Sequence, residues 1–251
     1  MNDGSGSMRI MLLNLQSPPK MRAFKIIACL LEYDIDVFVL SELSAGEGSA
    51  TVLAALEKSG YQIYWRKPER RDFSVALAIR GVRHRAVAWP STVELSRFQI
   101  LRLRIQSQEF AIFGTYFPAL NKSNLTRRRN ALAVLEPFLR SALANKDRCV
   151  MFGGDINDIP TWHRPRIYEY SQEGHIIGRM SERLGLADLN RMYLPALSYS
   201  WYDRYGAGQL LDGMYISDAH KYLVDEYYLC DEIRVSGLSD HAGLVVGLKT
   251  S

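Results

Sequence analysis

The sequence predicts a single α/β domain in which two packed β-sheets are flanked by helices. Short runs rich in β-branched and aromatic residues recur along the whole chain, which is typical of strands. Segments with apolar residues at helical spacing lie between them. Strands alternate with helices only in the first third, and the rest is richer in strands. A strictly alternating parallel barrel therefore fits poorly, whereas two helix-covered sheets fit well.

The expected elements follow from these periodicities. The strands are predicted at Met8–Leu15, Val37–Ser41, Val75–Arg80, Phe98–Ile105, Phe110–Tyr116, Cys149–Gly153, Met214–Ser217 and Leu244–Leu248. The helices are predicted at Met21–Tyr33, Ser49–Ser59, Asn124–Asn145 and Gly178–Leu184. We expect Asn124 to cap the third helix, because Asn is a favoured residue at helix starts.

Length and composition are those of one globular domain. The chain has 251 residues, of which 47% are apolar and 23% charged, and this balance excludes disordered, collagen-like and low-complexity classes. No linker rich in Pro, Gly or Ser divides it, and no repeat recurs at a fixed period. We expect a flexible leader over residues 1–7 and a single domain over residues 8–251.

Cysteine content and hydropathy indicate the cellular compartment of the protein. Cys29, Cys149 and Cys230 lie in apolar surroundings and cannot all pair, which predicts free thiols and no disulfide-linked partner. The apolar runs are far shorter than the roughly 20 residues that span a bilayer. The polar N-terminus has no signal-peptide pattern. We therefore expect a cytoplasmic protein with no membrane partner; the sequence indicates no particular protein partner.

The net charge of +4 is mild and is compatible with a polyanionic partner. Basic residues gather at 66–71 and again at 122–129. Solvated loops and a solvated helix start are the simpler interpretation of both clusters.

Polar residues stand at the ends of five apolar segments. These residues are Asn14, Glu42, Tyr116, the pair Asp155 and Asn157, and the pair Asp240 and His241. A polar residue after a buried strand emerges at the rim of a sheet, where a rigid scaffold commonly presents catalytic groups. One such residue could be a turn former, but five with complementary chemistry indicate an active site.

These residue types suit attack of water on phosphorus. Glu42, Asp155 and Asp240 are hard oxygen ligands, which suit Mg²⁺ or Mn²⁺ and not zinc. The Asp155 carboxylate could take a proton from a water that the Asn157 amide orients. The His241 imidazole, oriented by Asp212, could donate to a phosphoryl oxygen.

Taken in order, nine segments resemble the endonuclease/exonuclease/phosphatase superfamily, and most closely its exonuclease III and abasic-site endonuclease branch. They are RIMLLNLQS, DVFVLSEL, FSVALAIR, FGTYFPA, VMFGGDIND, LGLADL, YSWYDRY, LLDGMYIS and LSDHAGLVVGL. The most specific are the GDxN and SDH elements, and the YFP and SWYD segments favour the exonuclease III branch. The resemblance implies a four-layered α/β sandwich of two packed mixed β-sheets flanked by helices.

The resemblance also implies a role for each matching residue. Glu42 would be the main metal ligand, with Asn14 beside the metal and Asp240 helping with the metal or the leaving group. Tyr116 would contact the scissile phosphate.

The remaining implied roles concern water, phosphate and substrate. Asp155 would position the attacking water with Asn157, and His241 would bind a phosphate oxygen while Asp212 orients it. Trp201 would lie at the substrate-side rim. Beside the resemblance, the run that includes Arg127 and Arg128 is a candidate for phosphate binding from a helix start, with a solvated helix face as the alternative.

Several positions depart from the branch pattern. Ser41-Glu42-Leu43-Ser44 replaces the usual Gln-Glu-Thr-Lys, Leu210 replaces an Arg, and the loop between Tyr205 and Asp212 is short. In abasic-site enzymes the corresponding region enters the DNA. These departures bear on abasic-site specificity and leave the phosphodiester chemistry in place.

The function we expect is a Mg²⁺-dependent phosphodiester hydrolase, a DNA endonuclease or exonuclease. The alternative is a phosphatase or phosphodiesterase of small or lipid phosphates on the same core, since the core contacts only a phosphate. A second alternative is a catalytically inactive binding module. The loops at 66–71, 119–129 and 159–170 carry no lipid-binding amphipathic stripe, which favours nucleic acid.

Overall fold

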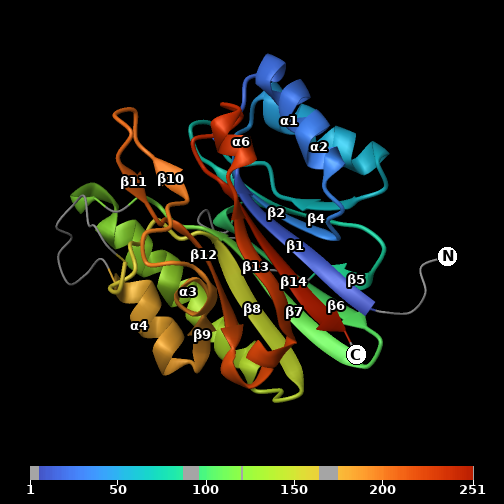
Figure 1. Cartoon of the computed structure of the whole chain (residues 1–251), viewed down its shortest axis with the longest axis vertical. Helices are drawn as coiled ribbons and strands as arrows, with labels where there is room; N and C mark the ends of the chain where they lie inside the picture. Colours follow the sequence, from blue (N-terminus) through green and yellow to red (C-terminus); the bar gives the residue numbers. More distant parts are fainter. Residues whose placement is uncertain (1–5, 87–95, 120, 164–174, 251) are drawn as a thin grey trace.

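Two six-stranded β-sheets pack face to face in the computed structural model, which describes residues 6–86, 96–119, 121–163 and 175–250 (Figure 1). The first sheet has the order β13-β14-β1-β2-β4-β3 and the second the order β5-β6-β7-β8-β12-β9. Among the strands of these residues, only β1–β2 and β7–β8 pair in parallel, so both sheets are mixed.

The strand bounds are as follows. The first sheet contains β1 (Gly6–Asn14), β2 (Val37–Leu43), β3 (Gln62–Trp65), β4 (Ser74–Ile79), β13 (Val224–Cys230) and β14 (Gly243–Thr250). The second contains β5 (Arg83–Ala86), β6 (Phe98–Ile105), β7 (Gln108–Tyr116), β8 (Arg148–Asp155), β9 (Leu186–Asp188) and β12 (Asp212–Ser217). A separate ribbon is formed by β10 (Trp201–Tyr202) and β11 (Gly208–Gln209).

Both faces of the central strands are buried, which explains their continuous apolar sequences. In β1, Ile10 and Leu12 belong to the core between the sheets, whereas Met11 and Leu13 belong to the core beneath the helices. This alternation follows from the two-residue period of a strand. A strand covered on both sides therefore needs apolar side chains at every position.

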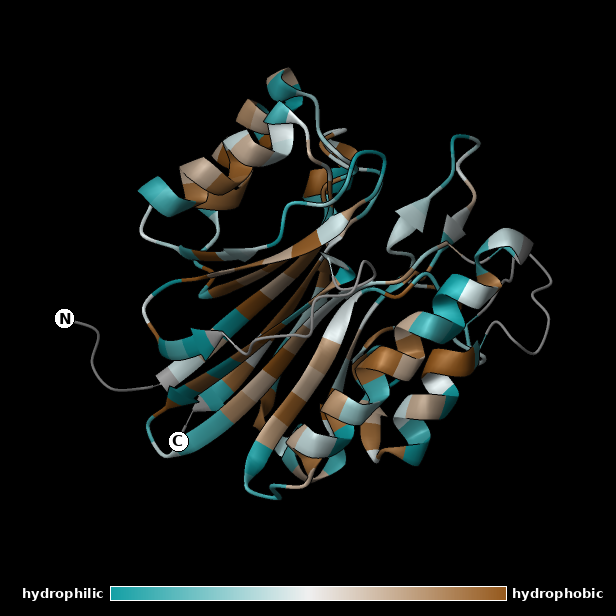
Figure 2. Ribbon diagram, turned by 180° about the vertical axis from the view of Figure 1, so that it is seen from behind, coloured by the Kyte–Doolittle hydropathy of each residue, from teal (hydrophilic) through white to brown (hydrophobic). Residues whose placement is uncertain are grey.

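Helices cover the two outer faces and complete four layers, as the sequence predicted (Figure 2). The helices are α1 (Lys20–Glu32), α2 (Glu47–Lys58), α3 (Leu125–Leu143), α4 (Ile176–Arg183), α5 (Leu189–Tyr193) and α6 (Glu232–Val235). Short 3₁₀ turns lie at Lys122–Asn124 and Asp218–Leu223. Helices α1 and α2 pack on the first sheet, and α3 and α4 on the second.

The eight predicted strands and four predicted helices all occur, with shifted ends. Strand β1 begins at Gly6, so the last two residues of the expected 1–7 leader belong to the strand, and residues 1–5 lie outside the described residues. The third helix begins at Leu125 after a 3₁₀ turn. Asn124 occupies the N-cap position of this helix, as predicted, but its side chain makes no capping hydrogen bond. Asn121 caps the preceding turn by accepting a hydrogen bond from the Asn124 backbone N–H at 3.0 Å.

The elements that the sequence did not predict are short or polar. Strand β3 is half exposed, and β5 reads Arg-His-Arg-Ala. Strand β13 alternates buried with more exposed residues and contains two acids. These strands lie at the edges of the sheets, where backbone pairing with a neighbouring strand stabilises them although their sequences carry no clear strand pattern.

The described residues include no helix long and apolar enough to cross a membrane. All three cysteines are free thiols, as expected. Cys149 and Cys230 are buried, whereas Cys29 is only half buried.

Gly154 is required by the geometry of β8. Its φ is +141°, and a Cβ atom there would lie 2.0 Å from the Thr115 backbone oxygen on β7. Because that oxygen belongs to the neighbouring strand, it cannot move aside as a flexible side chain would.

We expect Gly154→Ala to lower the free energy of unfolding by about 3 kcal/mol, through strain and overpacking, in urea denaturation. The matched control is Gly178→Ala on α4, where a Cβ atom meets nothing within 4 Å. That control should raise stability by about 0.5–1 kcal/mol, because alanine is the better helix former. Equal effects of the two substitutions would contradict this account of Gly154.

Candidate active site

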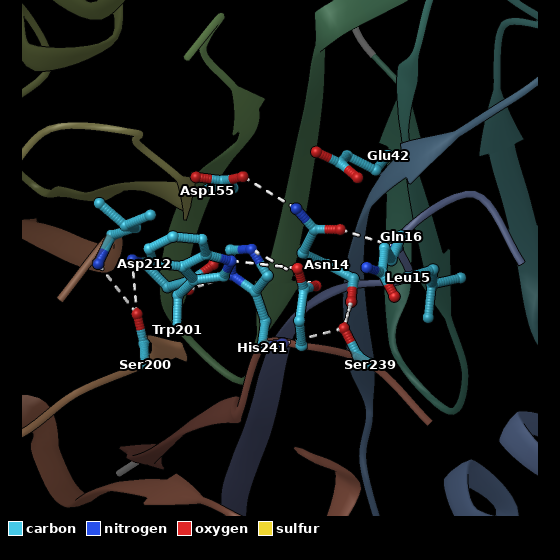
Figure 3. Close-up of polar contacts among 12 residues, drawn as sticks. Asn14, Leu15, Gln16, Glu42, Asp155, Ser200, Trp201, Asp212, Ser239 and His241 are labelled. Atoms are coloured by element: carbon cyan, nitrogen blue, oxygen red, sulfur yellow. Dashed lines mark hydrogen bonds and ion pairs between the residues drawn. The ribbon is translucent and has the colours of Figure 1, made fainter. Parts of the chain in front are cut away.

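The carboxyl ends of the two parallel strand pairs meet at one end of the sandwich. Asn14 pairs with Ser41 at the end of β1–β2, and Tyr116 pairs with Asp155 at the end of β7–β8. Asp212 starts the antiparallel β12 directly opposite Asp155. Strand order and direction therefore gather residues that are far apart in the sequence (Figure 3).

A cavity of about 220 Å³ lies at this end. It is lined by Glu42, Tyr116, Ala119, Asp155, Asn157, Trp201, Gln209, Leu211, Asp240 and His241. Seven of these were singled out from the sequence, so most of the candidate residues face one space.

A buried hydrogen bond joins the two sheets beneath the cavity. The Asn14 Nδ2 group donates to Asp155 Oδ2 at 2.9 Å. The Asn14 Oδ1 atom accepts from the Gln16 backbone N–H at 2.8 Å. Asn14 is fully buried, and both ends of its amide are engaged, so its observed role is to hold Asp155 in place.

Asp155 is buried among other charges. Its Oδ1 atom accepts from the Asn157 backbone N–H at 3.0 Å, and the Asn157 side chain donates to the Phe117 carbonyl at 2.9 Å. Burial raises the pKa of Asp155 well above its ordinary value, and the Asp212 and Glu42 carboxylates add to this while His241 opposes it. A carboxylate with a raised pKa is a stronger base, which suits it to accept a proton.

His241 is held by Asp212. The His241 Nδ1 atom lies 2.7 Å from Asp212 Oδ2, and its Nε2 atom lies 4.0 Å from Asp240 Oδ1. Burial disfavours the charged ring, but the charge and hydrogen bond of Asp212 outweigh it and raise the pKa of His241 to about 10. The ring is therefore a proton-bearing cation, whose positive charge suits a phosphoryl oxygen.

Glu42 reaches the cavity through a β-bulge. The register of β2 against β4 shifts between Leu40 and Leu43, and Glu42 has a φ of +52°. A bulge turns a side chain out of the regular ladder. Here that side chain is the carboxylate of Glu42, which lines the cavity. The strain of a positive φ in a non-glycine residue is typical of functional sites.

Tyr116 donates from its hydroxyl to Glu42 Oε1 at 2.9 Å. Burial raises the pKa of Tyr116, and the Glu42 and Asp155 carboxylates raise it further. The side chain is therefore a neutral phenol that can donate a hydrogen bond.

The donor set fits a hard divalent cation. Within the described residues, no three His, Cys, Asp or Glu side chains form a closed metal cluster. Asp240 Oδ2 accepts from Trp201 Nε1 at 3.1 Å, but its Oδ1 is buried with no hydrogen-bond partner in that part of the chain. A few carboxylate oxygens completed by water and substrate are what Mg²⁺ prefers, so Glu42 and Asp240 suit it.

The predicted substrate-binding residues lie in different places. Trp201 lines the cavity and also an adjoining hollow of about 590 Å³, which places it at the rim. Arg127 does not line the cavity; its half-exposed side chain lies 3.6 Å from Asp72.

The expectation that Arg128 contacts substrate is corrected, because its side chain is fully buried. Its guanidinium donates to the carbonyls of Pro118 at 2.6 Å, Asn157 at 3.0 Å and Ile156 at 3.3 Å. These carbonyls belong to the segments that follow β7 and β8. Arg128 therefore links the segment that follows Tyr116 to the segment that follows Asp155 and contains Asn157.

Sequence reasoning missed two residues that hold Asp212. The Ser200 hydroxyl accepts from the backbone N–H groups of Leu211 and Asp212 at 2.9 and 3.0 Å. The Asn190 side chain donates to the Asp212 carbonyl at 2.8 Å. Ser200 precedes Trp201 in the quoted segment YSWYDRY, and Asn190 directly follows the quoted segment LGLADL, so both stand where the resemblance could have pointed to them.

Two further residues contact residues of the site without lining the cavity themselves. The Ser239 hydroxyl donates to the Asn14 carbonyl at 2.6 Å and accepts from the His241 backbone N–H at 3.1 Å, joining β1 to the segment before β14. Arg97 lies over the Tyr116 ring, 4.7 Å from its centre. Ser239 precedes Asp240 in the SDH element, but no sequence signal marks Arg97.

The fold is shared with solved nucleases. No family model and no curated protein sequence matches the chain. The AP endonuclease LMAP from Leishmania major has a TM-score of 0.77 at 17% identity, over 99% of this chain and 90% of that one. An AP endonuclease from Archaeoglobus fulgidus has a TM-score of 0.77 at 18% identity, over 97% and 100%.

A third structure is the 3' phosphatase NExo from Neisseria, bound to a product DNA hairpin. Its TM-score is 0.75 at 21% identity, over 97% of this chain and all of that one. Such low identities show a common fold. The shared fold agrees with the two packed mixed β-sheets flanked by helices that the sequence predicted.

We expect Arg128→Met to lower the free energy of unfolding by about 3 kcal/mol, because it leaves buried carbonyls without a donor. Urea denaturation measures this. The control is Arg127→Met, which removes one partly exposed ion pair and should cost no more than about 1 kcal/mol. A smaller loss for Arg128→Met than for Arg127→Met would refute the structural role of Arg128.

Proposed function

We propose that this protein is a metal-dependent phosphodiester hydrolase that acts on DNA. The observation that carries the proposal is the meeting of Asp155, Glu42 and the His241–Asp212 pair around one cavity. Structures of AP endonucleases and of a 3' phosphatase bound to product DNA share the fold, which supports phosphate-ester chemistry on nucleic acid.

In the proposed reaction, water attacks phosphorus and the bond from phosphorus to the leaving oxygen breaks. Asp155 accepts a proton from the attacking water, and Asn157 lies beside it to orient that water. The His241 cation holds a nonbridging phosphate oxygen, and Tyr116 offers a neutral donor to the same group.

Glu42 and Asp240 are the residues that would hold the metal. When bound, a divalent cation offsets the negative charge that develops on the phosphate oxygens. Burial raises the pKa of Asp155, and the Asp212 and Glu42 carboxylates raise it further; such a gathering of negative groups favours a cation.

DNA is favoured over a small phosphate by the surroundings of the cavity. The adjoining hollow of about 590 Å³ is lined by Trp201, Tyr202, Arg204 and Tyr205, among others. Tyr205 is 79% exposed, and the Arg204 guanidinium lies 4.7 Å from the centre of its ring. Exposed aromatic and arginine side chains suit stacking and phosphate contacts with an extended substrate.

The first experiment is a gel assay of the purified protein on supercoiled plasmid, end-labelled duplex, single strand and a duplex with one abasic site. We expect cleavage with Mg²⁺ or Mn²⁺ and none with chelator, because phosphate charge must be offset. Asp155→Asn should reduce cleavage by at least about a hundredfold. The exposed Asp218→Asn is the matched control and should retain activity.

The pattern of results distinguishes the alternatives. Failure to cut any nucleic acid, together with release of phosphate from inositol phosphates or headgroup from phospholipids, would replace this proposal with a phosphatase or phosphodiesterase. Full activity of Asp155→Asn would overturn the site assignment. Binding without hydrolysis of any substrate would indicate an inactive binding module.

A second prediction concerns the partner of His241. Asp212→Asn keeps the shape of the side chain but removes the charge that holds the ring protonated and oriented. We expect kcat to fall by about 10²–10⁴-fold with a much smaller change in KM, measured on the preferred substrate. An unchanged kcat would show that the Asp212–His241 pair is structural only.

A further inference from the structure

A second charged hollow lies on the second sheet. Arg83 and Arg85 on β5 stand opposite Arg104 and Arg102 on β6. Directly opposed residues of an antiparallel pair project from the same face, so these four side chains, called here the arginine cluster, share one face. They line a hollow of about 410 Å³ together with His84, Leu103 and Glu109.

The arginine cluster is remote from the candidate active site. Arg104 pairs with Glu109 at the start of β7, and Tyr116 lies at the other end of that strand. Arg102 pairs with Ala111, so the two rows of the cluster lie five and seven residues from Tyr116, or about 16 and 23 Å along the strand. Figure 1 shows β5 and β6 at the side of the molecule away from β10 and β11.

Within the part of the chain that the structure describes, the positive charge of the cluster is balanced only in part, through Glu109. Among the described residues, no ion pair or side-chain hydrogen bond engages the guanidinium of Arg83, Arg85, Arg102 or Arg104. Glu109 is the only acid among the lining residues, and Arg148 already binds it at 2.9 Å.

This arrangement is unfavourable for the protein by itself. Like charges directly opposite one another destabilise a sheet. Burial lowers the pKa of Arg102, and the neighbouring Arg148 and Arg85 lower it further, while the Glu109 carboxylate opposes them. An anion in the hollow would relieve this repulsion.

We propose that the arginine cluster binds phosphate groups of a nucleic-acid segment distant from the point of cleavage. All four positions are arginine, whose planar fork of donors matches phosphate bidentately, whereas lysine offers only a point charge. The inference rests on the proposed function for its choice of polyanion.

The spacing of the cluster favours nucleic acid over an acidic protein. Arginines two residues apart on one strand are separated by about 6.6 Å, and opposed pairs by about 5 Å. This compact two-by-two array matches the dense, regular charge of a phosphate backbone, which carries about one charge per 3.4 Å of axis on each strand.

The test is fluorescence anisotropy in chelator, with a duplex of about 60 base pairs, for wild type and Arg83→Gln/Arg85→Gln. Both side chains are exposed on an edge strand. We expect binding to weaken about tenfold and the slope of log affinity against log salt to fall in magnitude by about two. Arg102→Gln/Arg104→Gln, with thermal melting of each variant, repeats the test on the partner strand.

The matched control is Lys25→Gln/Lys58→Gln, which removes the same charge from exposed positions on α1 and α2. It should bind the long duplex within about twofold of wild type. Equal weakening by the control and by folded cluster variants would overturn the inference, as would equal competition by an acidic polypeptide of the same charge.

A short substrate separates this inference from the proposed function. A hairpin with a stem of about three base pairs is about 10 Å long, too short to reach from Tyr116 to the level of Arg102, which lies about 16 Å away along the strand. With metal present, cluster variants should hydrolyse it at the wild-type rate. Failure of wild type to hydrolyse it would count against the proposed function, while the binding measured in chelator would still decide the role of the cluster.

Discussion

The two parallel strand pairs, β1–β2 and β7–β8, lie in opposite sheets with their carboxyl ends at the same end of the sandwich. The buried hydrogen bond from Asn14 to Asp155 crosses between these sheets at 2.9 Å. The cavity depends on this constraint, because Glu42 comes from one pair and Asp155 from the other. Any shift of one sheet against the other would separate the carboxylates and break a buried polar contact.

The groups that line the cavity are held by buried residues that do not line it. Arg128 joins the segments after β7 and β8, Ser239 joins β1 to the segment before β14, and Ser200 holds the start of β12. Each uses side-chain atoms to satisfy buried backbone groups. Glu42 keeps its positive φ where the Tyr116 hydroxyl donates to its carboxylate and the Ser17 backbone N–H donates to its carbonyl.

The sandwich has opposite charge requirements at its two ends. At one end, Asp155 and Asp240 gather near Glu42, and a buried oxygen of Asp240 has no hydrogen-bond partner among the described residues. At the other, the arginine cluster has no acid free to balance it within the same described part of the chain. A cation at the first and phosphates at the second would satisfy both, and a hydrolase acting on a long polyanion would use both.

The sequence by itself determined the layers of strands and helices, because the spacing of apolar residues along each segment is a local signal. It also determined most of the residues that line the cavity, because polar residues at strand ends are a local signal too. Glu42, Asp155 and His241 could be singled out in this way. Only the tertiary structure decided that Arg128 is buried, since its neighbours Arg127 and Arg129 look the same in sequence. It also decided the cross-strand pairing of Arg83 with Arg104, because register between distant strands depends on packing and not on either strand alone.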